Sequence, residues 1–470
     1  MKIVALNGSP KGKYSNTIQI IRYIGSCYSD NEIKIIDIGM KIKELDKNVA
    51  VFDNIMNEIE SADCILWCYP VYTFLIPYQL MHFIDLIYER NRTGAFKGKY
   101  TSQVLTSMHF YDHTAYNYLL NISEDLDMRT IPGISLEMND LFTEKGRNTI
   151  KKFGHELFTS ISNGFYSTKK FKLSNYDQTP FKCNVGFVEK NVTPKKIILI
   201  TDATDDDKNL FEMIKAYENA LPFPVTKVNL NDLKLYGGCL GCLQCTFEGH
   251  CFYKDGFDKF HRSVILEADI IIYAASINRH YFNSSWIKYD NRQFYNGHRI
   301  TFAGKAAGYL ISGNLREESN LREIIEARSN VGEYYLIDVV TDEVESTDAG
   351  DVISENAINT RIKKLAEKTV YALQNSPERP SNFYGVGGMK IFRDLVYSMQ
   401  GIMQEDYRFY KKTGRFDYPQ NNKRQLLLFK ILGFFLKFKS IRAKARTGMN
   451  KMMLKKFEKV IMQESKNNQD

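Results

Sequence analysis

The feature that most constrains the fold of this chain is a repeat, because short strand-like segments of the first half return in the same order in the second half. Residues 2–6, Lys-Ile-Val-Ala-Leu, match Lys-Ile-Ile-Leu-Ile at an offset of 194 residues. Residues 62–66 and the pair Gly98-Lys99 each have a match at an offset of 206. Such short matches also arise by chance among α/β sequences, but their common order and offset favour a duplication. The second copy has then gained twelve residues between its first and third strands.

Each copy alternates β-rich runs with helical patterns, which is typical of βαβ units around a parallel sheet. In the first copy we expect strands at 3–6, 33–38, 64–68 and 104–107, and helices at about 16–26, 51–61, 78–90 and 144–162. At 470 residues the chain is too long for a single hydrophobic core. The sequence therefore predicts an α/β protein with two tandem three-layer (αβα) domains on parallel sheets.

Changes in composition predict the domain boundaries. We expect a first domain at residues 1–164, a polar and aperiodic linker at 165–194, and a second domain with a cysteine cluster at 195–375. A helical, basic C-terminal extension follows at 376–470.

The net charge of +8 is concentrated in that extension. Residues 421–460 hold 12 Lys and Arg against one acidic residue, whereas the rest of the chain carries −3. Residues 426–438 form an apolar run, interrupted by Lys430 and Lys437, that is too short to span a bilayer. The run predicts either peripheral contact with an anionic membrane surface or a helix packed over the two domains. No recognised module surrounds the charge, so nucleic acid is not expected as a partner.

The N-terminus predicts a cytoplasmic protein. Met1 leads directly into a strand-like run, without the charged segment, apolar run and cleavage site of an export signal. Eight cysteines are too few for a disulfide scaffold in a chain of this length, so we expect core thiols or metal ligands. Membrane association through residues 421–460 is the alternative to a purely cytoplasmic location.

A Gly/Ser-rich loop lies between the first strand and the first helix. Such a loop offers free backbone N–H groups and the positive end of the helix dipole, so it predicts an anion site. An ordinary turn with an N-cap serine is the alternative. The spacing fits neither the dinucleotide nor the ATP-binding glycine pattern. The side chains that could surround one phosphate are Ser9, Ser15, Asn16 and Thr17.

Two further segments, 69–74 and 107–111, lie at the carboxyl ends of later strands, where ligands of open α/β sheets bind. Both combine turn residues with aromatic ones, as a planar heterocycle beside a phosphate would require. The three loops together predict one ligand site, although each aromatic residue taken singly is more often part of the core or the surface.

Four cysteines fall within thirteen residues of the second copy, with the spacing C-x2-C-x2-C-x5-C. They are Cys239, Cys242, Cys245 and Cys251. Gaps of two residues suit a cubane iron–sulfur cluster. Two alternatives remain open. Zinc is one, because its four-cysteine sites use similar gaps, and four unligated thiols are the other.

The first copy resembles the NADPH-dependent FMN reductase family of flavodoxin-like proteins over roughly residues 1–160. The resemblance rests on Gly8-Ser9-Pro10-Lys11, Ser15-Asn16-Thr17, Ala62-Asp63 and Tyr69-Pro70-Val71-Tyr72. It implies a flavodoxin-like fold, FMN as cofactor and NAD(P)H as co-substrate. Family members often have arginine where this chain has Lys11, which supplies charge but not a bidentate fork.

Carried over residue by residue, the resemblance implies two sets of FMN contacts. The phosphate would be bound by Ser9, Lys11, Ser15, Asn16 and Thr17. The ring and ribityl chain would be contacted by Pro70, Val71, Tyr72, Thr73, Phe74, Ser107, Met108 and His109. Hydride transfer to a flavin needs no protein nucleophile or base, so no catalytic residue is expected.

The cysteine run resembles the compact motif of archaeal-type iron–sulfur flavoproteins, a branch of the same family, which implies a [4Fe-4S] cluster. The second copy departs from that branch at the phosphate loop, where Asp202, Asp205, Asp206 and Asp207 would repel a phosphate. We therefore expect no FMN there. In the family, oligomers bring the cluster of one subunit near the FMN of another. We hypothesise that the tandem copies make this contact within one chain.

These patterns predict an FMN-dependent NAD(P)H oxidoreductase that passes electrons between FMN in the first domain and a [4Fe-4S] cluster in the second. The expected acceptor is a small molecule or a protein, and the chain could form a homo-oligomer. The alternative is a flavodoxin-like electron carrier or scaffold without turnover, docking to a membrane or protein through its basic tail. The sequence does not choose between NADH and NADPH.

Overall fold

The structure is a computed structural model that describes residues 1–173, 179–343, 355–418, 422–435, 437–438 and 440–441. The chain divides into two units, Met1–Phe409 and Tyr410–Asp470, which are described separately.

The first sheet of the larger unit is parallel throughout. Its strands are β1 (Lys2–Asn7), β2 (Glu32–Asp37), β3 (Cys64–Pro70), β4 (Tyr100–Thr106), β5 (Arg129–Thr130) and β6 (Ile134–Leu136). The order is β2-β1-β3-β4-β5, and β6 pairs with β4. Cys64 to Tyr69 are all buried, as expected for a central strand covered on both faces. The strand order reverses between β1 and β3, and ligands bind beyond the carboxyl ends at such a point.

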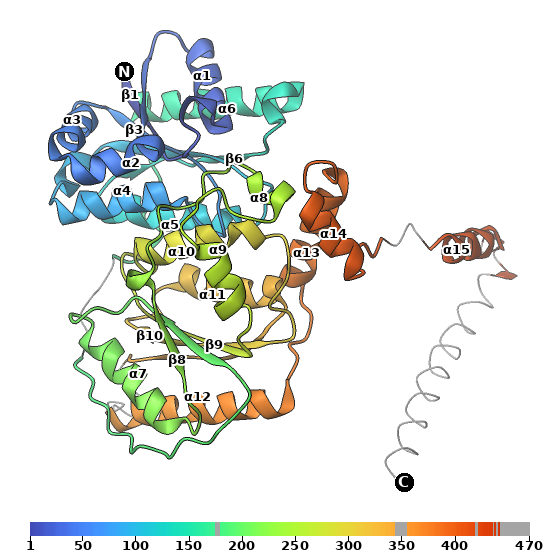
Figure 1. Cartoon of the computed structure of the whole chain (residues 1–470). Coiled ribbons are helices and arrows are strands. Elements are labelled where there is room, and N and C mark those ends of the chain that lie inside the picture. The colour runs from blue at the N-terminus through green and yellow to red at the C-terminus, as the bar shows by residue number, and fades with distance from the viewer. Residues whose placement is uncertain (174–178, 344–354, 419–421, 436, 439, 442–470) are drawn as a thin grey trace. The chain divides into compact units, whose positions relative to one another are not determined.

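Helices cover both faces of this sheet. One face packs against α1 (Asn16–Cys27) and α6 (Glu144–Asn163). The other packs against α2 (Ile38–Lys47), α3 (Val49–Glu60), α4 (Tyr78–Glu89) and α5 (Asp112–Asp125). Figure 1 shows the three layers, with α1 and α6 at the top.

The second sheet repeats the plan. Its strands are β7 (Ile197–Thr201), β8 (Thr226–Asn229), β9 (Ile270–Ser276), β10 (Ala306–Ser312) and β11 (Tyr335–Thr341). The order β11-β10-β9-β7-β8 is parallel and equivalent to that of the first sheet. The predicted fold class, two tandem flavodoxin-like three-layer domains with parallel sheets, is confirmed.

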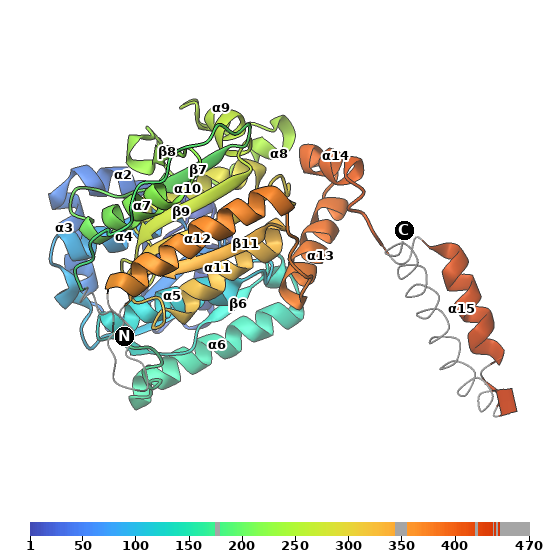
Figure 2. The ribbon, with the colours of Figure 1, turned by 90° about the horizontal axis from the view of Figure 1, so that it is seen from below.

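The outer face of the second sheet packs against α7 (Lys208–Ala220) and α12 (Glu355–Asn375), which Figure 2 shows in front of the strands. The other face packs against α9 (Phe257–Phe260), α10 (Ser284–Gln293) and α11 (Ser319–Gly332). The short α8 (Gln244–Glu248) lies in the cysteine loop. Single 3₁₀ turns lie at Gly12–Tyr14, Thr93–Phe96, Asp140–Phe142, Leu230–Asp232 and Phe294–Asn296, and a π turn at His261–Ile265.

The element positions locate the inserted residues. β8 begins 194 residues after β2, whereas β9, α10 and β10 begin 206 residues after β3, α4 and β4. The insertion therefore lies between β8 and β9, the interval that contains the four cysteines. Gly98 and Gly304, also 206 apart, both have a positive φ and both donate their N–H to the turn that follows the next helix.

The two domains meet through equivalent helices, α4 and α5 of the first against α10 and α11 of the second, in one continuous core. The interface is also polar. Asp85 on α4 forms an ion pair with Arg279. His280 is buried between Asp125 of the first domain and Glu318 of the second, each 2.9 Å from a ring nitrogen.

The segment after the second domain forms α13 (Phe383–Ser398), α14 (Gln404–Lys412) and α15 (Lys423–Phe435). α13 packs against α11, and Phe392 of α13 contacts the ring of Phe110 with centroids 4.5 Å apart. In the smaller unit, the apolar side chains of α15 are exposed. Among the described residues, no helix is long and apolar enough to cross a membrane.

Candidate functional site

The loop after β1 is shaped by Asn7. Its Nδ2 donates to the Gly12 carbonyl oxygen at 3.1 Å and to Asp37 Oδ1 at 2.6 Å, and its Oδ1 accepts from the Ser9 N–H at 3.1 Å. The Gly8 N–H donates to the Cys68 carbonyl oxygen at 2.8 Å. These bonds fold residues 8–15 into a compact loop at the carboxyl ends of β1 and β3.

The loop ends at the N-terminus of α1, whose N-cap is Ser15. The Ser15 side chain makes no capping hydrogen bond, and the first turn of α1 holds no acidic residue. Ser9, Ser15 and Thr17 are buried, while Lys11 and Asn16 are exposed. Thr17 is hydrogen-bonded to Thr106 at the end of β4, 3.0 Å between hydroxyl oxygens. An uncapped helix N-terminus with serine hydroxyls and a lysine is an anion-binding arrangement.

The loop after β3 is a tight turn. The Tyr72 N–H donates to the Leu75 carbonyl oxygen at 2.8 Å, and the Leu75 N–H donates back at 3.1 Å. Thr73 and Phe74 have φ values of 51° and 72°. Phe74 packs against Phe110 and Tyr111, and the Arg328 guanidinium lies over its ring, so this side chain lies in the domain interface.

The loop after β4 is organised by a residue that the sequence analysis did not identify. Asp112, at the start of α5, accepts from Ser107 at 3.0 Å and from Ser135, and its Oδ2 lies 3.0 Å from His109 Nδ1. Burial would raise the pKa of Asp112, but the hydrogen bonds from Ser135, His109 and Ser107 outweigh it and lower the pKa. Asp112 is therefore an anion that fixes the His109 ring, which is exposed, beside the strand ends.

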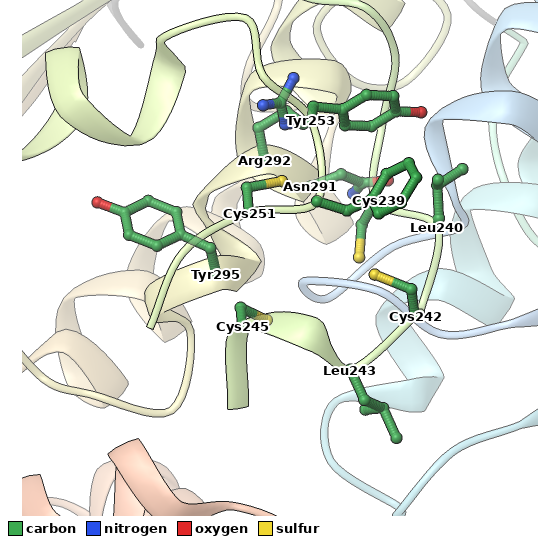
Figure 3. A pocket seen from close by; sticks show the side chains of 11 residues that line it. Cys239, Leu240, Cys242, Leu243, Cys245, Cys251, Tyr253, Asn291, Arg292 and Tyr295 are labelled. Atoms are coloured by element: carbon green, nitrogen blue, oxygen red, sulfur yellow. The ribbon is translucent and has the colours of Figure 1, made fainter. Parts of the chain in front are cut away.

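The four cysteines of the second domain line one pocket. In Figure 3 their sulfur atoms point toward a common space, with Leu240, Leu243, Tyr253, Asn291, Arg292 and Tyr295 around it. The Gly241 N–H donates to Cys239 Sγ at 3.3 Å. Burial raises the pKa of Cys239 to about 12 and that of Cys245 to about 11, so both are protonated thiols at neutral pH unless a cation replaces the proton.

The pocket wall carries two polar atoms without partners. Asn291 Nδ2 and Arg292 Nε are buried donors that have no hydrogen-bond acceptor. Each such donor costs about 1–3 kcal/mol unless something accepts from it. Four cysteine thiols and two unused donors have the chemistry that an anionic iron–sulfur cluster would need, because its sulfur atoms accept hydrogen bonds. In the described part of the chain, no set of three or more His, Cys, Asp and Glu side chains has donor atoms already close enough to hold a metal ion.

The cysteine loop lies against the predicted FMN loops of the first domain. A Cβ atom on Gly241 would lie 2.4 Å from Tyr72 Oη and 3.0 Å from Lys11 Cε. Gln79 donates to the Cys239 carbonyl oxygen at 3.3 Å, and the Tyr78 N–H donates to Asn291 Oδ1 at 3.0 Å. Burial and then the neighbouring Cys239 and Cys242 raise the pKa of Tyr72. The structure thus brings together two predicted sites that lie far apart in the sequence.

The second domain fills its own equivalent of the phosphate loop. Asp202, at the position of Gly8, is buried and accepts hydrogen bonds from Asn283 and Ser285. Asp207 accepts from the Thr204 N–H at 2.8 Å and from Ser276 at 2.8 Å. Because these carboxylates accept from Thr204 of the loop and from side chains of neighbouring segments, the arrangement differs from the uncapped loop of the first domain.

Comparisons with known proteins place the resemblance in the first domain. Residues 1–140 match the family model of NADPH-dependent FMN reductase. A comparison with curated proteins gave no match.

Among solved structures, an apo NADH:FMN oxidoreductase is 18% identical, covering 36% of this chain and 90% of that one, with a TM-score of 0.30. An FMN-dependent NADH-azoreductase from Bacillus anthracis, in complex with FMN, is 15% identical, covering 35% and 99%, with a TM-score of 0.26. General stress protein 14 from Treponema denticola, in complex with FMN, is 13% identical, covering 34% and 98%, with a TM-score of 0.26. The domain formed by β1–β6, over residues 1–140, is the part of this chain that matches the NADPH-dependent FMN reductase family.

Proposed function

We propose that this protein is an NAD(P)H-dependent FMN oxidoreductase in which FMN bound by the first domain exchanges electrons with a [4Fe-4S] cluster bound by the second. The match of residues 1–140 to the FMN reductase family supports FMN and oxidoreductase activity. The contact of the Gly241 backbone with Tyr72 and Lys11 is the observation that carries the electron relay, because it joins the cysteine loop to the flavin loops.

The residues of the first domain would position FMN as follows. Ser9, Ser15 and the N-terminus of α1 would bind the phosphate, with Lys11 compensating its charge. The backbone of Pro70 to Thr73 and the loop from Ser107 to His109 would contact the ring and the ribityl chain. Bound FMN supplies hydride acceptance, and a bound cluster supplies one-electron transfer.

The first experiment is anaerobic purification followed by analysis of FMN, iron, sulfide and zinc per chain. We expect about one FMN and about four iron atoms. Cys242→Ser should lose iron and keep FMN, whereas Cys27→Ser, at an exposed cysteine outside the pocket, should keep both. Zinc in place of iron, or thiols without metal, would reject the relay and leave a flavin reductase. Absence of FMN would reject the function as a whole.

A second measurement separates the enzyme from its rival, a flavodoxin-like electron carrier. Steady-state oxidation of NADH and NADPH is followed with flavin, quinone or nitroaromatic acceptors. We expect turnover with at least one nucleotide. A protein that binds FMN but oxidises neither nucleotide would favour the carrier.

We also propose that residues 421–460 bind an anionic membrane surface. The support is α15, where Leu427, Leu428 and Phe434 are 58–61% exposed and Lys423 and Lys430 are spaced seven apart, near one helix face. Cosedimentation with phosphatidylserine vesicles should exceed that with phosphatidylcholine vesicles. Leu428→Glu should abolish the difference, and Phe142→Glu, at an exposed residue of the first domain, should not. Equal sedimentation with both vesicle types would reject this proposal.

A further inference from the structure

One wall of the cysteine pocket is an arginine held with unusual rigidity. Arg292 on α10 is fully buried, and its two terminal nitrogens bind the two oxygens of Asp255 at 2.5 and 2.7 Å. The guanidinium lies over the rings of Tyr253 and Phe257, 4.6 and 5.1 Å from the centroids. Because Asp255 binds both terminal nitrogens and the guanidinium packs against two rings, the orientation of the guanidinium, and with it that of the Nε–H, is fixed.

Arg292 lines the cysteine pocket. It lies within hydrogen-bonding reach of the Cys251 sulfur, and its Nε is a buried donor with no acceptor, in a residue that is 1% exposed. Asn291, the preceding residue, is also 1% exposed. The Tyr78 N–H of the first domain donates to its Oδ1, which fixes the amide and leaves Nδ2 without an acceptor. Two adjacent side chains are thus oriented by other parts of the molecule so that one donor each stays unused at the pocket.

A buried donor without a partner calls for an explanation, and an acceptor bound in the pocket would supply one. Thiolate and sulfide atoms of an iron–sulfur cluster accept N–H donors, and such hydrogen bonds are one of the means by which proteins set the reduction potential. The reduced cluster carries one more negative charge than the oxidised one. Donors fixed near it therefore stabilise the reduced state more.

We propose that Asn291 and Arg292 donate hydrogen bonds to the cluster in the cysteine pocket and raise its reduction potential. They act as positioning residues, since Asn291 Nδ2 and Arg292 Nε would bind sulfur rather than iron. This inference rests on the proposed function. It adds that the first domain affects the potential through the bond from Tyr78 to Asn291.

The test is a dye-mediated reductive titration of the anaerobically purified protein, followed by the electron paramagnetic resonance signal of the cluster. Asn291→Asp keeps the acceptor for Tyr78 and replaces the donor by a negative oxygen. It should lower the midpoint potential or expel the cluster from a chain that circular dichroism shows to be folded. Asn296→Asp is the matched control, because Asn296 Nδ2 binds Thr301 outside the pocket. Its potential should equal that of the wild type.

Arg292 alone cannot be neutralised safely, because Asp255 would remain as a buried unpaired charge. The double variant Asp255→Asn with Arg292→Gln removes both charges and the Nε donor, and it should also lower the potential. A cluster whose potential is unchanged or higher in both Asn291→Asp and the double variant would overturn this inference and leave the proposed function intact. A wild-type protein without iron would overturn both.

Discussion

The two domains have the same backbone at a loop where their side chains differ completely. The turn from Tyr72 to Leu75 and the turn from Asn278 to Tyr281 carry the same pair of reciprocal hydrogen bonds. The two residues inside each turn have positive φ, Thr73 and Phe74 in one, Arg279 and His280 in the other. In the first domain the turn is uncharged and aromatic, and in the second it supplies cations to the interface. Backbone geometry alone therefore does not specify a cofactor site.

The loops after the first strands differ in the same way. In the first domain the position of Gly8 has no room for a side chain, since a Cβ atom there would lie 2.8 Å from the side chain of Leu80. In the second domain Asp202 occupies the same position and is bound by Asn283 and Ser285. The first loop presents hydrogen-bond donors, whereas the second loop carries carboxylates that accept hydrogen bonds. The comparison predicts that charge, not fold, decides which domain binds a phosphate.

The largest expected effect comes from giving the first loop the charges of the second. Lys11→Asp with Lys13→Asp places carboxylates at the positions of Asp205 and Asp207. Both lysines are exposed, so the change removes no buried side chain, although it alters the contact of Lys11 with Gly241. We expect FMN affinity to fall about a thousandfold, because four units of charge change beside a phosphate. Fluorescence titration of the apoprotein with FMN measures this affinity.

The control for this prediction is Lys151→Asp with Lys152→Asp, on exposed positions of α6. It makes the same change in net charge and should leave FMN affinity within about twofold. Equal losses in the two double variants would mean that the loop has no special role.

The next effect is a dependence of stability on pH from His280. Burial would lower its pKa, but the hydrogen bonds to Asp125 and Glu318 outweigh it and raise the pKa to about 9. The folded protein binds this proton more tightly than the unfolded chain. Its contribution, roughly 3 kcal/mol, is therefore complete below pH 6.5 and lost as the pH rises through 9. Urea unfolding at several pH values measures the free energy.

His280→Phe introduces the residue found at the equivalent position 74 and removes the titrating group. We expect this variant to be less stable than the wild type at pH 6.5, with little further change up to pH 9. His113→Gln, at an exposed histidine paired with Glu323, should retain the wild-type loss. A His280→Phe variant with the full wild-type slope would refute the assignment to His280.

Asp202 also makes stability fall as the pH rises, but over a lower pH range. Burial, and after it the charge of Asp207, raises its pKa to about 6. The folded state keeps this proton to a higher pH than the unfolded chain does, so stability is lost as the pH rises from about 4 through 6. Asp202→Asn should therefore be about 3 kcal/mol more stable than the wild type at pH 7 and nearly equal to it below pH 4. Asp205→Asn, at an exposed neighbour, should change stability by less than about 0.5 kcal/mol.

The smallest effect tests the contact between the two loops. Gly241 has a φ of 62° and lies against Tyr72 Oη, so Gly241→Ala should cost about 2 kcal/mol from backbone strain and the clash. Gly256 has a φ of 79° with nothing within 4 Å of its Cβ position, so Gly256→Ala should cost only the strain, about 1 kcal/mol. When Tyr72→Phe is also present, the stability lost through Gly241→Ala should fall to the amount lost through Gly256→Ala. Additive costs in the double variant would mean that the two residues do not touch.

Much of the fold was predictable from local patterns. The strands 3–6, 33–38 and 64–68 are short apolar runs, and the offsets of 194 and 206 reappear in the strand positions. Two helices of the first domain were not predicted. α2 follows β2 without a break, and α5 begins after a loop with two left-handed residues, His109 and Tyr111, so neither has a clear start signal.

The site was predictable only where its residues are neighbours in the sequence. The spacing of the four cysteines placed them in one loop, and the structure places them around one pocket. Asn291 and Arg292 lie some forty residues later, on a helix whose pattern gave no sign of the cysteines. Ser135 was missed for the same reason, since a tertiary contact brings it to Asp112. Asp112 was missed although it lies only three residues from His109 and five from Ser107.

The segment between the two domains keeps them associated at any protein concentration. Near its start, the Lys170 and Phe171 N–H groups donate to the buried carboxylate of Glu124 in the first domain, both at 2.9 Å. Further on, Phe181 and Val185 are part of the core of the second domain. A covalent tether anchored at both ends makes domain association a first-order event at an effective concentration in the millimolar range. Diluting the protein should therefore not separate the halves, and the two copies can diverge without having to recognise an unlike partner from solution.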